Sequence, residues 1–512
     1  MIKHGEDDHL DDDRPKEECG VLGLFAPDRP VANLAFFGLF ALQHRGQESA
    51  GIAVSDGSRV RMHRGMGLVN QVFHPDDLAM LKGHMAVGHT RYSTTGASVL
   101  RNAGPIYCQS QIGEIAVAHN GNLINTDELR EEMKAANIHL DTTSDSEMIA
   151  RILVSELHRG PEEAVREVMR RVKGAYSVTV LTPKMVIGFR DPHGVRPLTA
   201  GRILPVELPT GEKYAGGYMI ASETCAFGPV GGEPTHELAP GEMVIIDAQG
   251  MRFEQGIESP RKSMCLFEFI YFARPDSRMY GTSLYSARER MGMELAREHP
   301  VEADIVVPVP DSGIPAALGY SAVSGIPFRE GMMKSRYIHR TFIQPDQSLR
   351  ELGVRMKLTA LEDHLRGKRV ILVDDSIVRG TTTKQIIKLI RDAGATEVHV
   401  RITAPPIKFP CFYGIDMATR SELVAARLSV EELCQEVGAT SLGYLSIEGA
   451  SAAVGNMKDS FCFACFTGDY PIPIPPELQK LAFENPPSVG QMGTFHGSQP
   501  PLIVGTGNQD EA

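Results

Sequence analysis

Two adjacent aspartates occupy a position in the sequence where they could bind a sugar phosphate and a metal ion. Asp374 and Asp375 follow the apolar run 370–373, and the small, hydroxylated stretch 379–383 comes soon after them. Adjacent carboxylates can hold ribose hydroxyls and organise Mg²⁺, which prefers oxygen ligands. A loop that leads into a helix presents free N–H groups, which suit a phosphate. The pattern therefore indicates a phosphorylated sugar, although a polar turn that only ends a strand would look the same.

The cysteines offer a second kind of chemistry. The eight cysteines do not suggest a disulfide framework in a chain of this length. Cys462 and Cys465 have the spacing of a chelating turn, and spacing alone leaves zinc and iron–sulfur both open. Cys19 opens an apolar stretch, where cysteine is most often a packing residue. We therefore expect reactive or metal-binding roles for some cysteines and packing roles for the three without a partner motif, which are Cys108, Cys225 and Cys434.

The elements that must position these residues fall into two regions. Residues 19–257 mix short strands, Gly-containing turns and helical stretches, which predicts layered sheets and helices. Residues 258–470 alternate strands with helices, which predicts a parallel sheet. Its clearest unit is a strand–loop–helix–strand between 369 and 404, and ligands in such sheets bind beyond the carboxyl ends of the strands. The Pro- and Gly-rich stretch 471–512 is expected to be mostly disordered.

Composition excludes several classes of protein. The chain has 512 residues, 42% hydrophobic and 23% charged, which is typical of a globular protein of two or three domains. A net charge of −12 argues against nucleic acid as a partner. No apolar run approaches the roughly 20 residues that span a membrane. Residues 1–18 carry eight acidic and three basic residues and no apolar stretch, so they are not a secretory signal. A cytoplasmic protein is predicted.

The second region resembles a known family of enzymes. Residues 370–382 closely resemble the pyrophosphate–ribose–phosphate signature of type I phosphoribosyltransferases, which have an α/β fold. Strand 305–309 and the loop 310–313 fit the same family. The resemblance implies that phosphoribosyl pyrophosphate is bound by Asp374, Asp375, Arg379, Gly380, Thr381, Thr382 and Thr383.

The same resemblance implies a magnesium ion and a mobile loop. The loop 310–313 would bind pyrophosphate, and Ser312 would lie beside one Mg²⁺ together with Asp374 and Asp375. The basic and aromatic stretch 334–343, which begins at Lys334, looks like the loop that closes over the substrate and excludes water. A solvated surface loop is the alternative for this stretch.

The first region resembles class II glutamine amidotransferases. Cys19 is followed in order by the motifs 44–51, 88–93, 118–122 and 143–147. Together they resemble that family, whose fold is the α+β N-terminal-nucleophile sandwich of αββα layers. By resemblance Cys19 is the nucleophile, and the Asn120 side chain and Gly121 N–H form the oxyanion hole. Arg91 would bind the α-carboxylate of glutamine, and Asp145 its α-amino group.

The chemistry of an N-terminal nucleophile predicts a processed chain. A thiolate must attack the amide carbon of glutamine, and the released ammonia must be protonated by a nearby base. When cysteine is the first residue, its own α-amino group, with a pKa near 7.7–8.0, can act as that base. Cys19 is internal, so residues 1–18 are predicted to be a propeptide.

The two resemblances together imply one enzyme. Its substrates would be glutamine, phosphoribosyl pyrophosphate and water, and its products 5-phosphoribosylamine, pyrophosphate and glutamate, at the first committed step of purine synthesis. Ammonia would pass between the sites through a channel. Resemblance to a branch with one [4Fe–4S] cluster per subunit implies four ligands, Cys265, Cys411, Cys462 and Cys465. A homotetramer with feedback by purine nucleotides such as AMP and GMP is also implied.

Other interpretations account for less of the chain. Glucosamine-phosphate synthase and asparagine synthetase share the first domain, but their second domains do not explain residues 370–382. A catalytically idle protein that senses phosphoribosyl compounds or nucleotides is a further alternative. Complete catalytic motifs in both halves argue against it.

Overall fold

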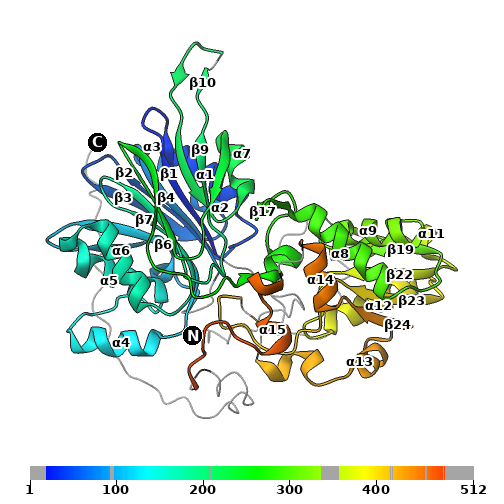
Figure 1. Ribbon diagram of the computed structural model, residues 1–512. Coiled ribbons are helices and arrows are strands. Elements are labelled where there is room, and N and C mark those ends of the chain that lie inside the picture. The colour runs from blue at the N-terminus through cyan, green and yellow to red at the C-terminus, as the bar shows by residue number, and fades with distance from the viewer. Residues whose placement is uncertain are drawn as a thin grey trace, which may run out of the picture.

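The chain folds into a sandwich of two antiparallel sheets followed by a domain built on a parallel sheet. A computed structural model describes residues 19–92, 97–207, 209–335, 357–415, 417, 419–455, 458–476 and 478. Figure 1 shows the two halves side by side, with the sandwich at the left and the parallel sheet at the right. The predicted propeptide 1–18, most of the predicted mobile loop and most of the predicted tail lie outside the described residues.

The sandwich consists of two antiparallel sheets. The first has the order β13 (Gly232–Glu237), β9 (Thr199–Ile203), β12 (Gly217–Ala221), β1 (Gly20–Phe25), β4 (Met85–Arg91), β2 (Ser49–Ser55) and β3 (Val60–Met66). The second has the order β15 (Gly250–Gln255), β14 (Glu242–Asp247), β8 (Val186–Arg190), β7 (Gly174–Leu181), β6 (Glu114–Leu123) and β5 (Ile106–Gln109).

Helices cover the two outer faces of the sandwich. In β1, Val21 packs between the sheets, while Leu22 and Leu24 pack toward α1 (Val31–Ala41), because successive side chains of a strand point to opposite faces. The second sheet is covered by α5 (Asp145–Glu156) and α6 (Pro161–Arg171). The layers are therefore helix, sheet, sheet, helix, which confirms the predicted αββα fold. The other helices of this half are α2 (Val69–Val72), α3 (Pro75–Met80), α4 (Thr126–Ala135) and α7 (Phe227–Val230), and a small ribbon pairs β10 (Val206–Glu207) with β11 (Lys213–Tyr214).

The second half is an α/β domain with four parallel strands. Their order is β19 (Ile305–Pro308), β22 (Arg369–Asp374), β23 (Glu397–Ile402) and β24 (Ser441–Tyr444). The predicted strand–helix–strand unit is present, with α12 (Thr381–Asp392) between β22 and β23. Residues 370–373 are buried, as expected for a strand covered on both faces. Further α-helices within the described part of this half are α8 (Leu284–Glu298), α9 (Ile314–Ser324), α11 (Glu362–Leu365), α13 (Val430–Val437), α14 (Ile447–Ala453) and α15 (Ala464–Thr467).

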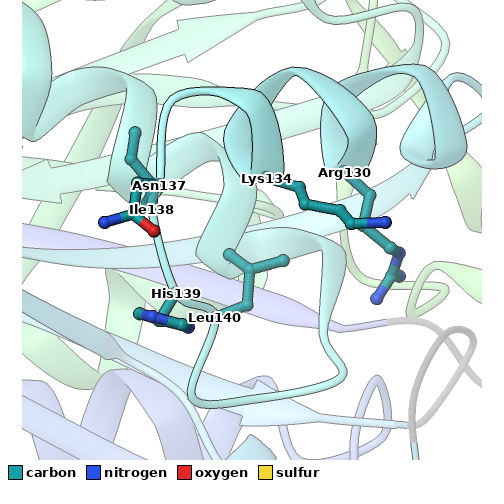
Figure 2. A pocket seen from close by; sticks show the side chains of 6 residues that line it. All are labelled: Arg130, Lys134, Asn137, Ile138, His139 and Leu140. Atoms are coloured by element: carbon teal, nitrogen blue, oxygen red, sulfur yellow. The ribbon is translucent and has the colours of Figure 1, made fainter.

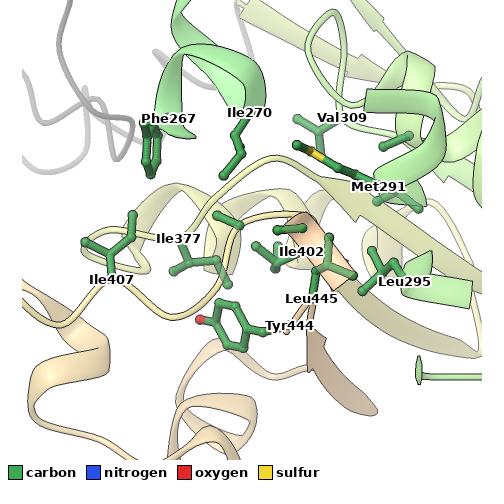
Figure 3. Packing of buried hydrophobic residues seen from close by; sticks show 14 of the residues in the cluster. Phe267, Ile270, Met291, Leu295, Val309, Ile377, Ile402, Ile407, Tyr444 and Leu445 are labelled. Atoms are coloured by element: carbon green, nitrogen blue, oxygen red, sulfur yellow. The ribbon is translucent and has the colours of Figure 1, made fainter. Parts of the chain in front are cut away.

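The core of the second half extends into the first. Figure 3 shows side chains of α8, among them Met291 and Leu295, gathered with Ile402 and Leu445. Ile124 and Ala175, which belong to the first half, are buried in the same cluster. This shared apolar core holds the two halves together.

Short strand pairs and the segment around residues 472–474 complete the second half. The small pairs are β16 (Met264–Cys265) with β25 (Phe461–Cys462), β17 (Arg278–Met279) with β18 (Thr282–Ser283), and β20 (Met332–Lys334) with β21 (Leu358–Ala360). Ile472 and Ile474 are buried, and the Tyr413 hydroxyl donates to the Ile472 carbonyl at 2.7 Å. Packed structure therefore continues past residue 470, because these two isoleucines give the chain an apolar anchor.

Candidate active sites

Cys19 lies at the start of β1 in a buried position. Its Sγ donates to the carbonyl oxygen of Tyr92 at 3.4 Å, and its own carbonyl accepts from Arg45 Nε at 3.2 Å. Burial raises the pKa of the thiol to about 11, although the positive charge of Arg91 opposes the shift. A thiol with this pKa is protonated at neutral pH, so the nucleophile needs a base close to it.

The predicted glutamine-binding pair is close to this thiol. Arg91 ends β4 and Asp145 begins α5; both are buried, and both influence the pKa of Cys19. Asp145 Oδ2 accepts from the Leu123 N–H at 3.1 Å, and its Oδ1 lies 3.6 Å from His119 Nδ1. Burial raises the pKa of Asp145, but His119 and the Leu123 N–H outweigh this effect and lower it. The carboxylate therefore stays charged, as binding of an ammonium group requires.

The predicted oxyanion residues lie on β6, which stacks against β1 and β4 of the other sheet. Asn120 is 1% exposed, and neither its Oδ1 nor its Nδ2 has a hydrogen-bond partner among the described residues. A buried amide without partners is costly unless a ligand satisfies it. Gly121 has φ +145°, and a Cβ there would collide with the Ala175 carbonyl, so glycine is required.

Two histidines that the sequence analysis left without a role support this strand. His89 Nε2 contacts the His119 carbonyl oxygen at 3.0 Å, and His119 Nδ1 contacts Ser146 Oγ at 3.2 Å. Burial lowers the pKa of His89 to about 3, so the ring is neutral. Both histidines lie inside the motifs that resemble the glutamine amidotransferases, and this position was the sequence feature that could have indicated their role.

A buried network of charges joins Cys19 to the second half. Arg45 contacts Glu223 through Nη1 and Glu268 through Nη2, the latter at 2.7 Å, and all three side chains are nearly fully buried. Glu268 follows Phe267 in an apolar stretch, and an acidic residue in such a position is the only sequence signal of this network. His44 contacts Glu223 at 2.7 Å.

The predicted phosphoribosyl site lies at the carboxyl ends of β19 and β22. Asp374 and Asp375 are buried, and the Asp375 N–H donates to Asp374 Oδ1 at 2.9 Å. Asp375 Oδ2 and Ser312 Oγ are buried oxygens without a hydrogen-bond partner among the described residues. Oxygen donors of this kind fit Mg²⁺. Lys334 Nζ donates to Asp311 Oδ2 at 3.0 Å, which places it beside the predicted pyrophosphate loop.

The loop from Arg379 leads into α12 as predicted. Gly380 caps the helix with φ +84°, and Thr381, Thr382 and Thr383 form its first turn, where N–H groups lack intrahelical acceptors. Arg379 Nη2 pairs with Glu422 at 2.8 Å, so its guanidinium lies toward that residue in this structure.

The four cysteines predicted as metal ligands lie together. Cys265 and Cys462 are paired residues of the parallel strands β16 and β25. Cys465 lies in α15, and its carbonyl accepts the N–H groups of Lys408 and Phe409, which brings the segment before Cys411 next to it.

The thiols of this site affect one another. Burial raises the pKa of Cys462 to about 12, with a contribution from Cys411, and that of Cys465 well above its ordinary value, with contributions from the other three. Four neighbouring thiols, of which Cys265 is buried and the other three are half-buried, suit a metal or cluster that binds thiolate. Among the described residues, no three His, Cys, Asp or Glu side chains converge on a position for one ion.

Two hollows lie outside the two predicted substrate sites. One of about 140 Å³ borders the cysteine site and is lined by residues including Arg261, Cys462 and Asp469. The other, of about 260 Å³, lies along α4 and the loop after it (Figure 2), and its lining residues are Arg130, Lys134, Asn137, Ile138, His139 and Leu140. No helix within the described part of the chain has the length and apolar character needed to cross a membrane.

A glutaminase sandwich with a buried cysteine, joined to a sheet with a sugar-phosphate loop, defines a glutamine-dependent phosphoribosyl-transferring enzyme. Family models agree, since a glutamine amidotransferase domain matches residues 89–204 and a phosphoribosyl transferase domain matches 284–404. An amidophosphoribosyltransferase of Synechococcus elongatus (strain ATCC 33912 / PCC 7942 / FACHB-805) is 51% identical over 91% of this chain and 94% of its own. An amidophosphoribosyltransferase of Bacillus subtilis (strain 168) is 45% identical over 90% of this chain and 95% of its own. This chain belongs to the amidophosphoribosyltransferase family.

Solved structures show the same arrangement of domains. The structure described as the allosteric regulatory enzyme of purine biosynthesis superimposes with a TM-score of 0.83 at 44% identity, covering 90% of this chain and 97% of that one. The glutamine phosphoribosylpyrophosphate amidotransferase of B. subtilis, complexed with ADP and GMP, superimposes with a TM-score of 0.82 at 44% identity, covering 90% of this chain and 98% of that one. The predicted order of a glutaminase followed by a phosphoribosyltransferase is confirmed.

Proposed function

We propose that this amidophosphoribosyltransferase divides its reaction between the two sites, with glutamine hydrolysed at Cys19 and phosphoribosyl pyrophosphate bound beyond Asp374 and Asp375. The overall reaction converts glutamine, phosphoribosyl pyrophosphate and water into 5-phosphoribosylamine, pyrophosphate and glutamate, the first committed step of purine synthesis. The main observation in support of two separate reaction sites is that each half holds its own buried polar site, one around Cys19 and one at the end of β22.

The glutaminase half-reaction begins with a proton transfer. After residues 1–18 are removed, the α-amino group of Cys19 accepts the thiol proton, and Sγ attacks the amide carbon of glutamine. Asn120 and the Gly121 N–H stabilise the oxyanion, and the protonated amine returns its proton to the leaving ammonia. Water then hydrolyses the thioester on Cys19, which releases glutamate and restores the thiol. Arg91 and Asp145 hold the amino-acid end of the substrate through charge-assisted hydrogen bonds.

The second half-reaction joins ammonia to the ribose. Asp374 and Asp375 orient the ribose hydroxyls, while the first turn of α12 binds the 5-phosphate through its N–H groups. Mg²⁺, held with the substrate near Asp374, Asp375 and Ser312, would supply positive charge that stabilises the departing pyrophosphate. Lys334 lies beside the pyrophosphate loop through Asp311, and ammonia arrives through a channel between the halves.

The cysteine site and the regulation complete the proposal. Cys265, Cys411, Cys462 and Cys465 would hold a [4Fe–4S] cluster, which would tie distant segments together without taking part in either half-reaction. We also propose feedback by purine nucleotides such as AMP and GMP, supported by the nucleotides bound to the B. subtilis relative. We also propose a homotetramer and a cytoplasmic location, which the family resemblance supports.

Paired variants test the division of the reaction. Cys19→Ala should abolish glutamine-dependent synthesis while ammonia at alkaline pH still yields phosphoribosylamine. Asp374→Asn with Asp375→Asn should remove both activities, because neither ammonia source helps when the ribose is mispositioned. Mass spectrometry and circular dichroism establish that each variant is processed and folded. Loss of the ammonia-dependent rate in a folded Cys19→Ala protein would contradict two separate sites.

Processing is tested with the unprocessed chain itself. Protein that retains residues 1–18, purified and identified by its intact mass, should lack glutaminase activity, since Cys19 then has no α-amino group to act as base. Full glutaminase activity in that protein would show that the amine is not the base.

A further inference from the structure

The loop 411–414 of the second half lies directly against the strand that carries the oxyanion residues. Asn122 Nδ2 donates to the Phe412 carbonyl at 3.0 Å, across 290 positions of sequence. Gly414 packs on Gly121 itself, since a Cβ on Gly414 would lie 2.9 Å from the Gly121 carbonyl carbon and 3.0 Å from its Cα. The backbones of the two halves are therefore in contact at the predicted oxyanion hole.

Tyr413, the third residue of this loop, is also bound by the first half. The fully buried guanidinium of Arg196 donates from Nε to the Tyr413 carbonyl at 2.8 Å. Arg196 Nη1 also lies 3.6 Å from Glu268 Oε1, within the network that includes Arg45. Three consecutive residues of the loop thus each touch the first half, which leaves the loop little freedom to move independently of β6.

The other end of the loop belongs to the cysteine site. The Tyr413 N–H donates to Cys411 Sγ at 3.4 Å, and the Tyr413 hydroxyl is bonded to the Ile472 backbone at both its N–H and its carbonyl. A short stretch of backbone, residues 411–414, therefore links the cysteine site to the strand that carries Gly121.

We propose that loop 411–414 is a positioning element for the oxyanion hole of the glutaminase half-reaction. The proposal rests on the role assigned above to Asn120 and Gly121. An oxyanion donor acts only when it is aimed correctly, and a misplacement of about 1 Å can cost roughly 10²-fold in rate. Gly414 packs directly on Gly121, so there is no gap between them that could absorb such a shift.

The main variant is Gly414→Ala, matched by Gly455→Ala. The two glycines have φ +105° and +98°, so alanine causes similar backbone strain at both, but a Cβ on Gly455 meets no described residue within 4 Å. The glutaminase kcat of Gly414→Ala, normalised to the ammonia-dependent rate of the same preparation, should fall by roughly ten- to a hundredfold with little change in KM. Gly455→Ala should show no such fall.

A binding measurement separates misplacement of the oxyanion hole from general damage. The aldehyde analogue of glutamine forms a tetrahedral adduct with Cys19 and so requires the oxyanion hole, whereas glutamate forms no adduct and is held at its amino-acid end by Arg91 and Asp145. Gly414→Ala should weaken the aldehyde much more than glutamate. Asn122→Ala, which removes the bond to Phe412 without adding strain, should give the same pattern more weakly.

The outcomes distinguish this proposal from the one on which it rests. If Asn120→Ala keeps its glutaminase kcat, the oxyanion assignment fails and this inference fails with it. If Asn120→Ala loses activity while Gly414→Ala and Asn122→Ala keep it, only the positioning role is overturned. An equal loss of affinity for aldehyde and glutamate, or an equal effect of Gly455→Ala, would overturn it too.

Discussion

Arg45 and Glu268 form a buried ion pair between the two halves of the molecule, with Nη2 and Oε1 2.7 Å apart. They lie 223 positions apart in the sequence, and their side chains are 1% and 2% exposed. Arg45 also bonds to the carbonyl of Cys19, so an acidic residue of the second half helps to place the proposed nucleophile of the first. Burial makes this pair far more consequential than an ion pair at the surface.

Removal of one partner should therefore be strongly destabilising. Glu268→Gln leaves the guanidinium of Arg45 buried with less compensating charge, and the free energy of unfolding should fall by about 3–5 kcal/mol. Denaturant unfolding measures the change. Glu207→Gln, which breaks the exposed pair with Lys213 at 3.1 Å, is the matched control and should cost less than about 1 kcal/mol. Equal effects of the two variants would show that burial does not set the strength of the pair.

The same network predicts a dependence of stability on acid. Burial raises the pKa of Glu223, but His44 and Arg45 outweigh it and hold the pKa well below its usual range. A carboxyl whose pKa is lowered by folding contributes stability above its unfolded pKa, about 4.3, and loses it as the pH falls toward the folded pKa. The unfolding temperature of the native chain should therefore drop more steeply below about pH 4 than that of Glu223→Gln. Parallel curves would contradict the assignment.

The pH profile of the glutaminase should report the base, not the thiol. The pKa of the Cys19 thiol is about 11 in the buried site, whereas an unperturbed α-amino group has a pKa of about 7.7–8.0. If the amine accepts the proton, kcat/KM for glutamine should rise with pH and level off above roughly pH 8. An ascending limb near pH 11 would mean that the thiol ionises without help from the amine.

The cysteine site should be needed for folding as well as for metal binding. Cys465→Ser removes one of four thiols, and because the binding energy of a metal site is largely folding energy, the variant should lose iron and fold poorly. Cys434→Ser changes a half-buried cysteine outside the site and should keep both iron and stability. Iron, sulfide and zinc analysis of protein purified without oxygen measures the outcome. One zinc per chain and no iron would show that the metal was chosen wrongly.

The sequence alone determined the features that depend on neighbouring residues. The strand at 370–373, the loop with Asp374 and Asp375, and the helix that begins at Thr381 are all present as predicted. Buried runs, turn chemistry and helix starts are local, so they can be read without the fold. The motifs around Cys19 carried enough local pattern to predict the sandwich and its order before the parallel sheet.

Only the tertiary structure decided which distant residues meet. It paired Cys265 with Cys462, placed Glu268 on Arg45, and laid Gly414 against Gly121. No spacing or periodicity encodes these contacts, because each depends on how the two halves pack through their shared core. A single Glu between phenylalanines, or a Gly two residues after Phe412, can occur in many folds, so the local sequence does not predict its distant contact. Close approach of backbones across the domain boundary gives these residues their roles here, and that approach is a property of the assembled molecule.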